Sequence, residues 1–115
     1  MAFDELLADR VRGVIAAIDG EVSERKMFGG LAFLLNGHMF AGIVGDDLMV
    51  RLDAEGAQAA LRREHVREMD FTGRPSKSMV YVAADGLQGA ALSEWVTAAA
   101  FSARGLAAKR GHRGR

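Results

Sequence analysis

The segment Thr72–Ser78 holds the side chains best suited to chemistry in this 115-residue chain. Its sequence, TGRPSKS, supplies Arg74 and Lys77, whose cations can bind phosphate or carboxylate groups, together with nearby hydroxyls. The spacing is not that of a P-loop, which needs G-x-x-x-x-G-K-[ST] between a strand and a helix. Ser76 and Lys77 are adjacent and point apart in an extended segment, which disfavours a Ser-Lys nucleophile. We expect a solvated loop, with an anion-binding site as the alternative.

Arg25 and Lys26 form a second basic pair, and Gly29 and Gly30 follow it. Backbone N–H groups of a glycine pair can bind an anion, although a turn or bulge between strands is the simpler explanation. Adjacent residues of a strand point to opposite faces, so the two cations are not expected to act together. The candidates for binding an anion or a protein partner are Arg25, Lys26, Arg74 and Lys77.

Other catalytic patterns are missing from the sequence. The chain contains no cysteine, which excludes disulfides, thiolate nucleophiles and cysteine-based zinc sites. The three histidines, at positions 38, 65 and 112, do not have the spacing of a metal pair. Neither a nucleophile elbow nor a dinucleotide fingerprint is present. We therefore expect no catalytic residue, no metal and no cofactor; the alternative is a small enzyme in which Ser76, Lys77 and His38 converge.

The composition predicts one soluble domain. Half of the residues are apolar and 26% are charged, and the length suits a single core. No apolar run is long enough to span a membrane, and residues 1–5 lack the basic start of a signal peptide, so we expect a cytoplasmic protein. Residues 104–115 carry five of the fifteen basic side chains and no acidic one. We expect a domain over residues 1–106 and a disordered basic tail over 107–115.

Two amphipathic helices are expected, one near each end of the chain. Apolar side chains over residues 3–18 recur at helical spacing opposite charged ones. Residues 87–104 form the second helix, whose apolar stripe consists of Leu92, Trp95, Val96, Ala99 and Ala103. Phe101 lies on the opposite side of that helix, and an exposed phenylalanine favours self-association.

The remaining elements are strands over residues 22–28, 31–35, 38–44, 48–52, 69–71 and 79–83, with a short helix over 54–63 capped by Asp53. Asn36-Gly37 is a strong hairpin signal, because a type I′ turn needs positive φ at both central positions. The turn sets a register in which Leu35 faces His38 and Phe33 faces Phe40. The face expected to lie under the helices then carries Ala32, Leu34, Met39, Ala41, Ile43, Leu48, Val50 and Leu52.

The second sheet face is unexpectedly apolar in this register. It carries Leu31, Phe33, Leu35, His38, Phe40, Met49 and Arg51. Such a face needs a cover or a partner. A short element or the 53–72 connection can fold over it, two copies can pair through it, or it can form a ligand groove. We expect a homodimer, with the interface candidates Phe33, Phe40, Met49 and Phe101.

Three motifs, in order, resemble the N-terminal domain of the TfoX/Sxy competence-regulator family. They are RKMFGGLAFLLNGHMFAGIVGDDLMVRL over 25–52, DFTGRPSKSMVYV over 70–82, and a final helix that contains Trp95 and Val96. The resemblance covers residues 3–108 and matches 25–29 to the family's Arg-Lys-Met-Phe-Gly motif and 73–77 to its Gly-Arg-Pro-x-Lys motif. Ser76 and Ser78 stand where the family pattern favours Met and Gly.

The resemblance implies an α+β domain: an antiparallel sheet of about five strands with the N-terminal and C-terminal helices packed on it, in the α-β(5)-α order of secretion-chaperone-like folds. It also implies a non-enzymatic regulatory or protein-binding domain, whose partner we expect to be a second copy or another regulatory protein. Full-length competence regulators carry a further C-terminal domain that these residues do not include. Transcriptional regulation through nucleic-acid contacts of the basic tail is therefore kept as an alternative, as is anion binding by the Arg74–Lys77 loop.

Overall fold

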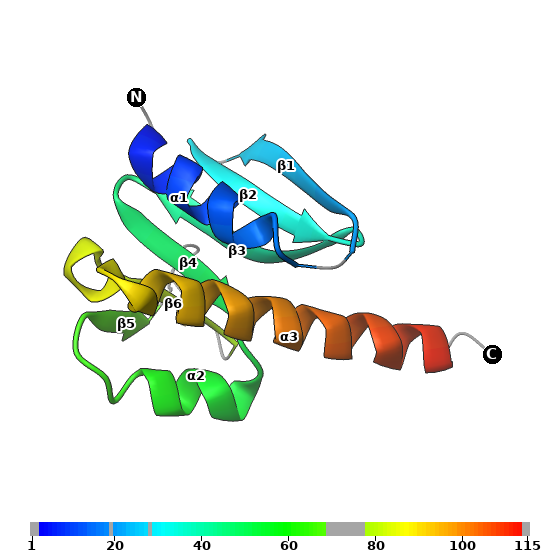
Figure 1. The fold of residues 1–115 in the computed structure, drawn as a ribbon. Coiled ribbons are helices and arrows are strands. Elements are labelled where there is room, and N and C mark those ends of the chain that lie inside the picture. The colour runs from blue at the N-terminus through cyan, green and yellow to red at the C-terminus, as the bar shows by residue number, and fades with distance from the viewer. Residues whose placement is uncertain (1–2, 19, 28, 69–77, 114–115) are drawn as a thin grey trace.

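The computed structural model describes residues 3–18, 20–27, 29–68 and 78–113, with the backbone alone for Met27 and residues 105–113. These ranges form three α-helices and a six-stranded antiparallel sheet of strand order β1-β2-β3-β4-β6-β5 (Figure 1). The elements are α1 (Glu5–Ile15), β1 (Val22–Met27), β2 (Gly30–Leu35), β3 (His38–Val44), β4 (Asp47–Arg51), α2 (Ala54–Ala60), β5 (Val66–Glu68), β6 (Met79–Val82), the 3-10 helix η1 (Ala84–Leu87) and α3 (Ala90–Arg113). The predicted α+β fold is confirmed, with one strand more than the resemblance implied.

Helix α1 begins directly after its N-cap residue, Asp4. The Asp4 carboxylate accepts hydrogen bonds from the backbone N–H groups of Leu6 (2.9 Å) and Leu7 (3.2 Å), which satisfies donors that have no partner inside the helix. Helix α1 is therefore slightly shorter than the predicted 3–18. Its buried side contacts α3, and Arg10 donates a 2.6 Å hydrogen bond to the carbonyl of Leu87 at the end of η1. The two terminal helices lie side by side on one face of the sheet (Figure 1).

The β2–β3 hairpin confirms the predicted turn but not the whole predicted register. Asn36 and Gly37 have φ values of 52° and 87°, as a type I′ turn requires. Leu35 pairs with His38 and Leu34 with Met39, as expected. The pairing then shifts, and Phe33 faces Ala41 instead of Phe40. Phe40 is thus the additional residue of a β-bulge, in which two residues of β3 lie opposite one residue of β2.

This bulge reverses the predicted face of β2. Residues Leu31, Phe33 and Leu35, together with Phe40, belong to the core under the helices. The assignment of Phe33 and Phe40 to an open second face is wrong, since both side chains are 0% exposed. On the other strands the predicted core position is confirmed for Ala41, Ile43, Leu48, Val50 and Leu52. The predicted core position of Met39 is wrong, because Met39 packs against Met49, Met79 and Tyr81 on the opposite face of the sheet.

The other half of the sheet follows the predictions more closely. Val44 pairs with Asp47 across the two-residue turn at Gly45-Asp46. Strand β6 places Val80 and Val82 in the core and its alternate residues on the opposite face. Strand β5 lies at 66–68 and pairs with β6. The predicted strand over 69–71 falls outside the described residues.

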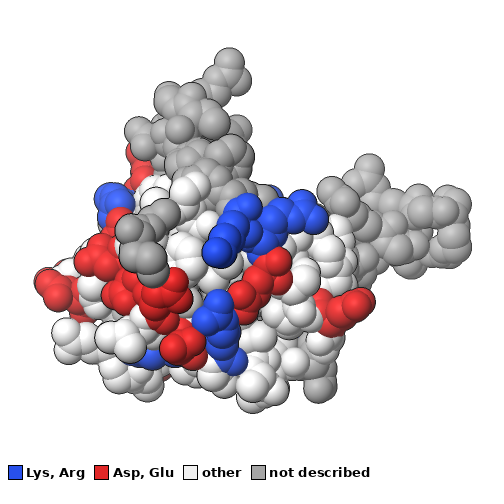
Figure 2. All heavy atoms as spheres, turned by 90° about the horizontal axis from the view of Figure 1, so that it is seen from above, with Lys and Arg blue, Asp and Glu red and all other residues white. Residues whose placement is uncertain are grey.

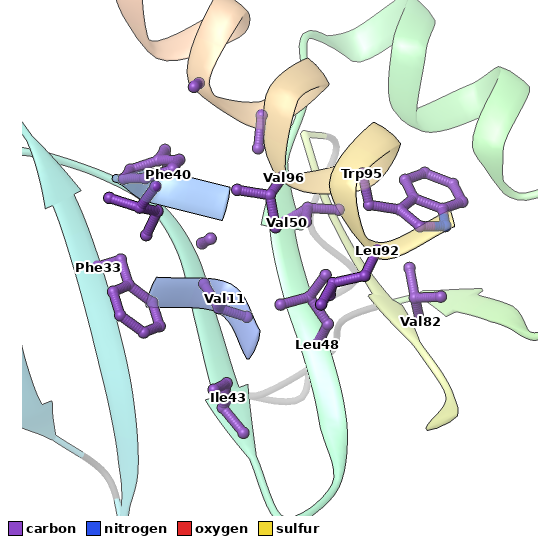
Figure 3. Close-up of a cluster of buried hydrophobic side chains, with 14 of the residues drawn as sticks. Val11, Phe33, Phe40, Ile43, Leu48, Val50, Val82, Leu92, Trp95 and Val96 are labelled. Atoms are coloured by element: carbon purple, nitrogen blue, oxygen red, sulfur yellow. The ribbon is translucent and has the colours of Figure 1, made fainter. Parts of the chain in front are cut away.

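Helix α3 completes the core and extends further than expected. Its predicted stripe of Leu92, Trp95, Val96, Ala99 and Ala103 is buried against the sheet (Figure 3). The guanidinium carbon of Arg63 lies 4.4 Å from the centre of the Trp95 ring, a cation–π contact. The helix continues to Arg113, beyond its predicted end at residue 104. Alanines favour helix, and an isolated glycine costs only about 1 kcal/mol in a helix interior.

Candidate functional site

Of the four basic candidates, the structure describes Arg25 and Lys26. Arg25 and Lys26 are exposed in β1, where Arg25 pairs with Ala32 and Lys26 with Leu31. Ala32 and Leu31 lie on opposite faces of the sheet, so the two cations also point apart, as predicted. Arg74 and Lys77 lie outside the described residues. A role for these four residues in binding stays a prediction.

The open face, by which we mean the sheet face opposite α1 and α3, carries a second apolar cluster. Met49, Met79 and Tyr81 form it, and Met39 and Val44 pack against them. Met49 thus lies on the second face as predicted. Only 7% of Met49, 6% of Met79 and 8% of Tyr81 is exposed. The open face therefore offers much less apolar surface for docking than the predicted register implied.

Two arginines on the open face have contrasting surroundings. Arg67 lies with its guanidinium carbon 4.7 Å from the centre of the Tyr81 ring and donates a 2.6 Å hydrogen bond to Asp47. This hydrogen bond to the Asp47 carboxylate raises the pKa of Arg67. Arg51 ends β4, and its Nε is buried with no hydrogen-bond acceptor in the described part of the chain. The sequence predicts Arg51 on this face, but Arg51 is not among the predicted site residues. The signal in the sequence is a basic residue within an otherwise apolar strand.

A groove lies between α1 and α3. Its volume is about 380 Å³, and its lining consists of Gly13, Val14, Ala17 and Ile18 from α1 and Ser93, Thr97, Ala100, Phe101 and Arg104 from α3. The Phe101 side chain is 78% exposed at this groove, which confirms its predicted position opposite the buried stripe. Leu6 is the other large apolar side chain that is strongly exposed in the described ranges. Sequence reasoning identified Phe101 but not the groove.

Helix α1 is tied to the edge strand by a small ion-pair network. Arg12 donates hydrogen bonds of 2.7 and 2.9 Å to the two carboxylate oxygens of Glu24 in β1, and a third of 2.9 Å to Asp9. The hydrogen bond from Arg12 lowers the pKa of Glu24, and Glu24 in turn raises that of Arg12. Figure 2 shows acidic and basic side chains of the described residues interspersed on the face seen from above.

Replacing Arg12 with glutamine should lower the free energy of unfolding by less than about 1 kcal/mol at pH 7, because both partners are partly exposed. The Glu24 pKa is lower in the folded than in the unfolded chain, so the ion pair stabilises at neutral pH and the contribution is lost as the pH falls through the folded pKa. Urea denaturation at neutral and acidic pH measures the change in the free energy of unfolding. Arg62→Gln, an exposed position on another surface, is the control. An equal loss at both pH values would contradict the prediction.

Across residues 3–18, 20–27, 29–68 and 78–104, no group of three or more His, Asp or Glu side chains could hold a metal ion. None of the helices described here is both long and apolar enough to cross a membrane.

The fold and its surface define a small α+β domain with a six-stranded antiparallel sheet, an apolar core under two terminal helices and a groove between those helices. The model of the TfoX N-terminal domain family matches residues 14–103, which is most of the chain. The chain therefore belongs to the TfoX N-terminal domain family and is a TfoX-like regulatory or binding domain. No curated protein and no solved structure matches the chain.

Proposed function

We propose that this chain is a non-enzymatic regulatory or protein-binding domain that acts as a homodimer. Membership of the TfoX N-terminal domain family supports a regulatory or binding role. The observation that carries the homodimer is the 78% exposed side chain of Phe101 beside the groove between the terminal helices. A large aromatic side chain next to a groove is the arrangement that anchors many protein interfaces.

The proposed interface differs from the one expected from the sequence. Phe33 and Phe40 supplied the reason to place the dimer on the second sheet face, and both are buried inside the single chain. Met49 lies on the open face but has little exposed surface. Phe101 is the interface candidate that remains well exposed, and it lies on the helical side of the molecule.

The nucleic-acid alternative receives no additional support from the described side chains. Arg25 and Lys26 point to opposite faces of β1, whereas binding to a phosphate backbone favours cations on one continuous surface. The enzyme and anion-binding alternatives depend on Arg74, Ser76 and Lys77, which lie outside the described residues. These alternatives, and the cytoplasmic location, stay predictions.

Sedimentation velocity of the purified chain tests the proposed homodimer. At tens of micromolar the sedimenting species should have twice the mass of one chain. Dilution should dissociate this dimer, as expected for an interface of modest area. The chain contains no cysteine, so a disulfide cannot produce the dimer. A monomeric mass over the whole concentration range would contradict the proposal.

A further inference from the structure

Strand β1 forms one edge of the sheet and pairs with β2 alone among the described strands. Figure 1 shows it at the rim of the sheet. Residues 23–26, which make up the middle of β1, are all exposed. The strand is six residues long, and no proline interrupts it. An edge of this kind presents backbone groups to which another extended chain can add.

The pairing with β2 determines which backbone groups of β1 face outward. The N–H of Asn36 donates a 2.8 Å hydrogen bond to the carbonyl of Glu21, the residue before β1. In an antiparallel pair, residues that bond the neighbouring strand alternate with residues whose backbone groups point away from it. Counting from Glu21, the backbone groups of Val22, Glu24 and Lys26 point away from β2. No backbone hydrogen bond joins these three groups to another described element.

Two cations on this edge have no ion-pair partner among the described residues. Arg25 and Lys26 are both exposed, and neither takes part in an ion pair within the described ranges. The acid next to them, Glu24, accepts hydrogen bonds of 2.7 and 2.9 Å from Arg12 and is thereby neutralised. The edge therefore combines outward-facing backbone groups with two positive charges that lack a counter-charge.

We propose that the outer edge of β1 binds an extended segment of another protein that carries two consecutive acidic residues. The segment adds one more strand to the sheet and bonds the backbone groups of Val22, Glu24 and Lys26. Lys26 lies on the helical face, since it pairs with the core residue Leu31, and Arg25 lies on the open face. Consecutive residues of an added strand also point to opposite faces, so each cation meets one acid.

A second copy of β1 fits this edge poorly. A two-fold antiparallel pairing centred on residue 24, 25 or 26 places that residue opposite itself, and like charges directly opposite each other destabilise a sheet. The consecutive acidic pairs of this chain are also already placed within its fold. Asp4-Glu5 lies at the start of α1, and Asp46-Asp47 lies at the turn between β3 and β4. The acidic segment is therefore one from a different protein.

The backbone of the edge favours a peptide over a nucleic acid. A polypeptide supplies both N–H donors and C=O acceptors at strand spacing, as the outward groups of β1 require. A phosphate backbone supplies acceptors but no such ladder of donors. The two cations also point to opposite faces, which suits the alternating side chains of a strand.

This inference goes beyond the proposed homodimer, because β1 does not line the groove beside Phe101. An NMR titration of the full chain tests it. The probe is the acetylated and amidated octapeptide Thr-Val-Thr-Asp-Glu-Thr-Val-Thr, and the control peptide has two lysines in place of the acids. At roughly 90% saturation with the acidic peptide, the N–H groups of Val22, Glu24 and Lys26 should exchange with solvent about tenfold more slowly, because only free chains then exchange.

Charge reversals test the recognition of the acids. Arg25→Glu and Lys26→Glu should each raise the dissociation constant of the acidic peptide about fivefold, and added salt should raise it further in the wild-type chain. Arg62→Glu is the matched control, since Arg62 is also exposed but follows α2, far from β1 (Figure 1). Its dissociation constant should stay unchanged. Circular dichroism checks that the variants keep the fold.

Each contrary outcome overturns a stated part of the inference. Binding that leaves the three outward N–H groups unprotected overturns strand addition. Equal binding of the lysine peptide, or an equal effect of Arg62→Glu, overturns recognition of the acids. A short oligothymidylate that shifts the β1 signals more strongly than the acidic peptide overturns a peptide as the occupant. Sedimentation of the chain without peptide reports on the homodimer separately, so either proposal can fail alone.

Discussion

Phe33→Ala is expected to lower the free energy of unfolding by about 3–5 kcal/mol, a large share of the roughly 5–15 kcal/mol that stabilises a typical domain. Phe33 is 0% exposed and lies on β2 opposite the bulge, beneath the terminal helices (Figure 3). Truncation to alanine removes apolar area from the core and leaves a cavity that neighbouring side chains only partly fill. Urea denaturation followed by circular dichroism measures the change.

Phe101→Ala is the matched control for this prediction. The same side chain is removed, but from a position that is 78% exposed, so in dilute solution the free energy of unfolding should change by no more than about 0.5 kcal/mol. Similar losses in the two variants would contradict the corrected register, because Phe33 would then not be a core residue of the single chain.

Gly30→Ala is expected to have the second largest effect, a loss of about 1–3 kcal/mol or more. A Cβ atom at Gly30 would overlap the carbonyl oxygen of Ile43 in β3 and lie 3.2 Å from Val44 Cγ2. The oxygen belongs to the backbone, so β2 and β3 must move apart to make room. The glycine is required here by the close approach of two strands.

Gly13→Ala provides the contrast. This glycine lies inside α1, and an added Cβ meets nothing within 4 Å. Alanine in place of an unconstrained helical glycine should stabilise the chain by roughly 0.5–1 kcal/mol. Denaturation midpoints of the two variants should therefore shift in opposite directions. A midpoint that does not fall in Gly30→Ala would contradict the close packing of β2 and β3 at Gly30.

Local chemistry made several elements of this fold predictable. Asn36-Gly37 predicts its turn because few other dipeptides tolerate positive φ at both positions. Asp53 caps α2 through a 2.6 Å hydrogen bond from the N–H of Gly56. Helical spacing also identified the buried side of α3 and the exposed position of Phe101. Each of these predictions depends on residues that are close together in the chain.

The bulge at Phe40 could not be predicted from local chemistry, because it arises from how β3 pairs with β2. One additional residue reverses the alternation for one strand, so Leu31, Phe33 and Leu35 change faces together. The sequence did contain an indirect signal. The uninterrupted register placed too many large apolar residues on a face without a helix, and that excess pointed to an error in the pairing.

The groove between α1 and α3 could not be predicted from the sequence for a different reason. Its two walls come from α1 and α3, which lie at opposite ends of the chain, and its space results from small residues on both helices. Periodicity places residues on a helix side but does not say how far apart two helices pack. Phe101 could therefore be identified as exposed, while the cavity next to it could not.

The most direct test of this account is a measurement of contacts between copies. In a mixture of isotope-labelled and unlabelled chains, filtered nuclear Overhauser spectra report only proton pairs that belong to different chains. The account predicts signals between the Phe101 ring of one copy and the methyl groups of Thr97 and Ala100 of the other. Signals between copies from the Met49 methyl group, with none from Phe101, would contradict an interface at Phe101. They would place the interface on the open face of the sheet instead.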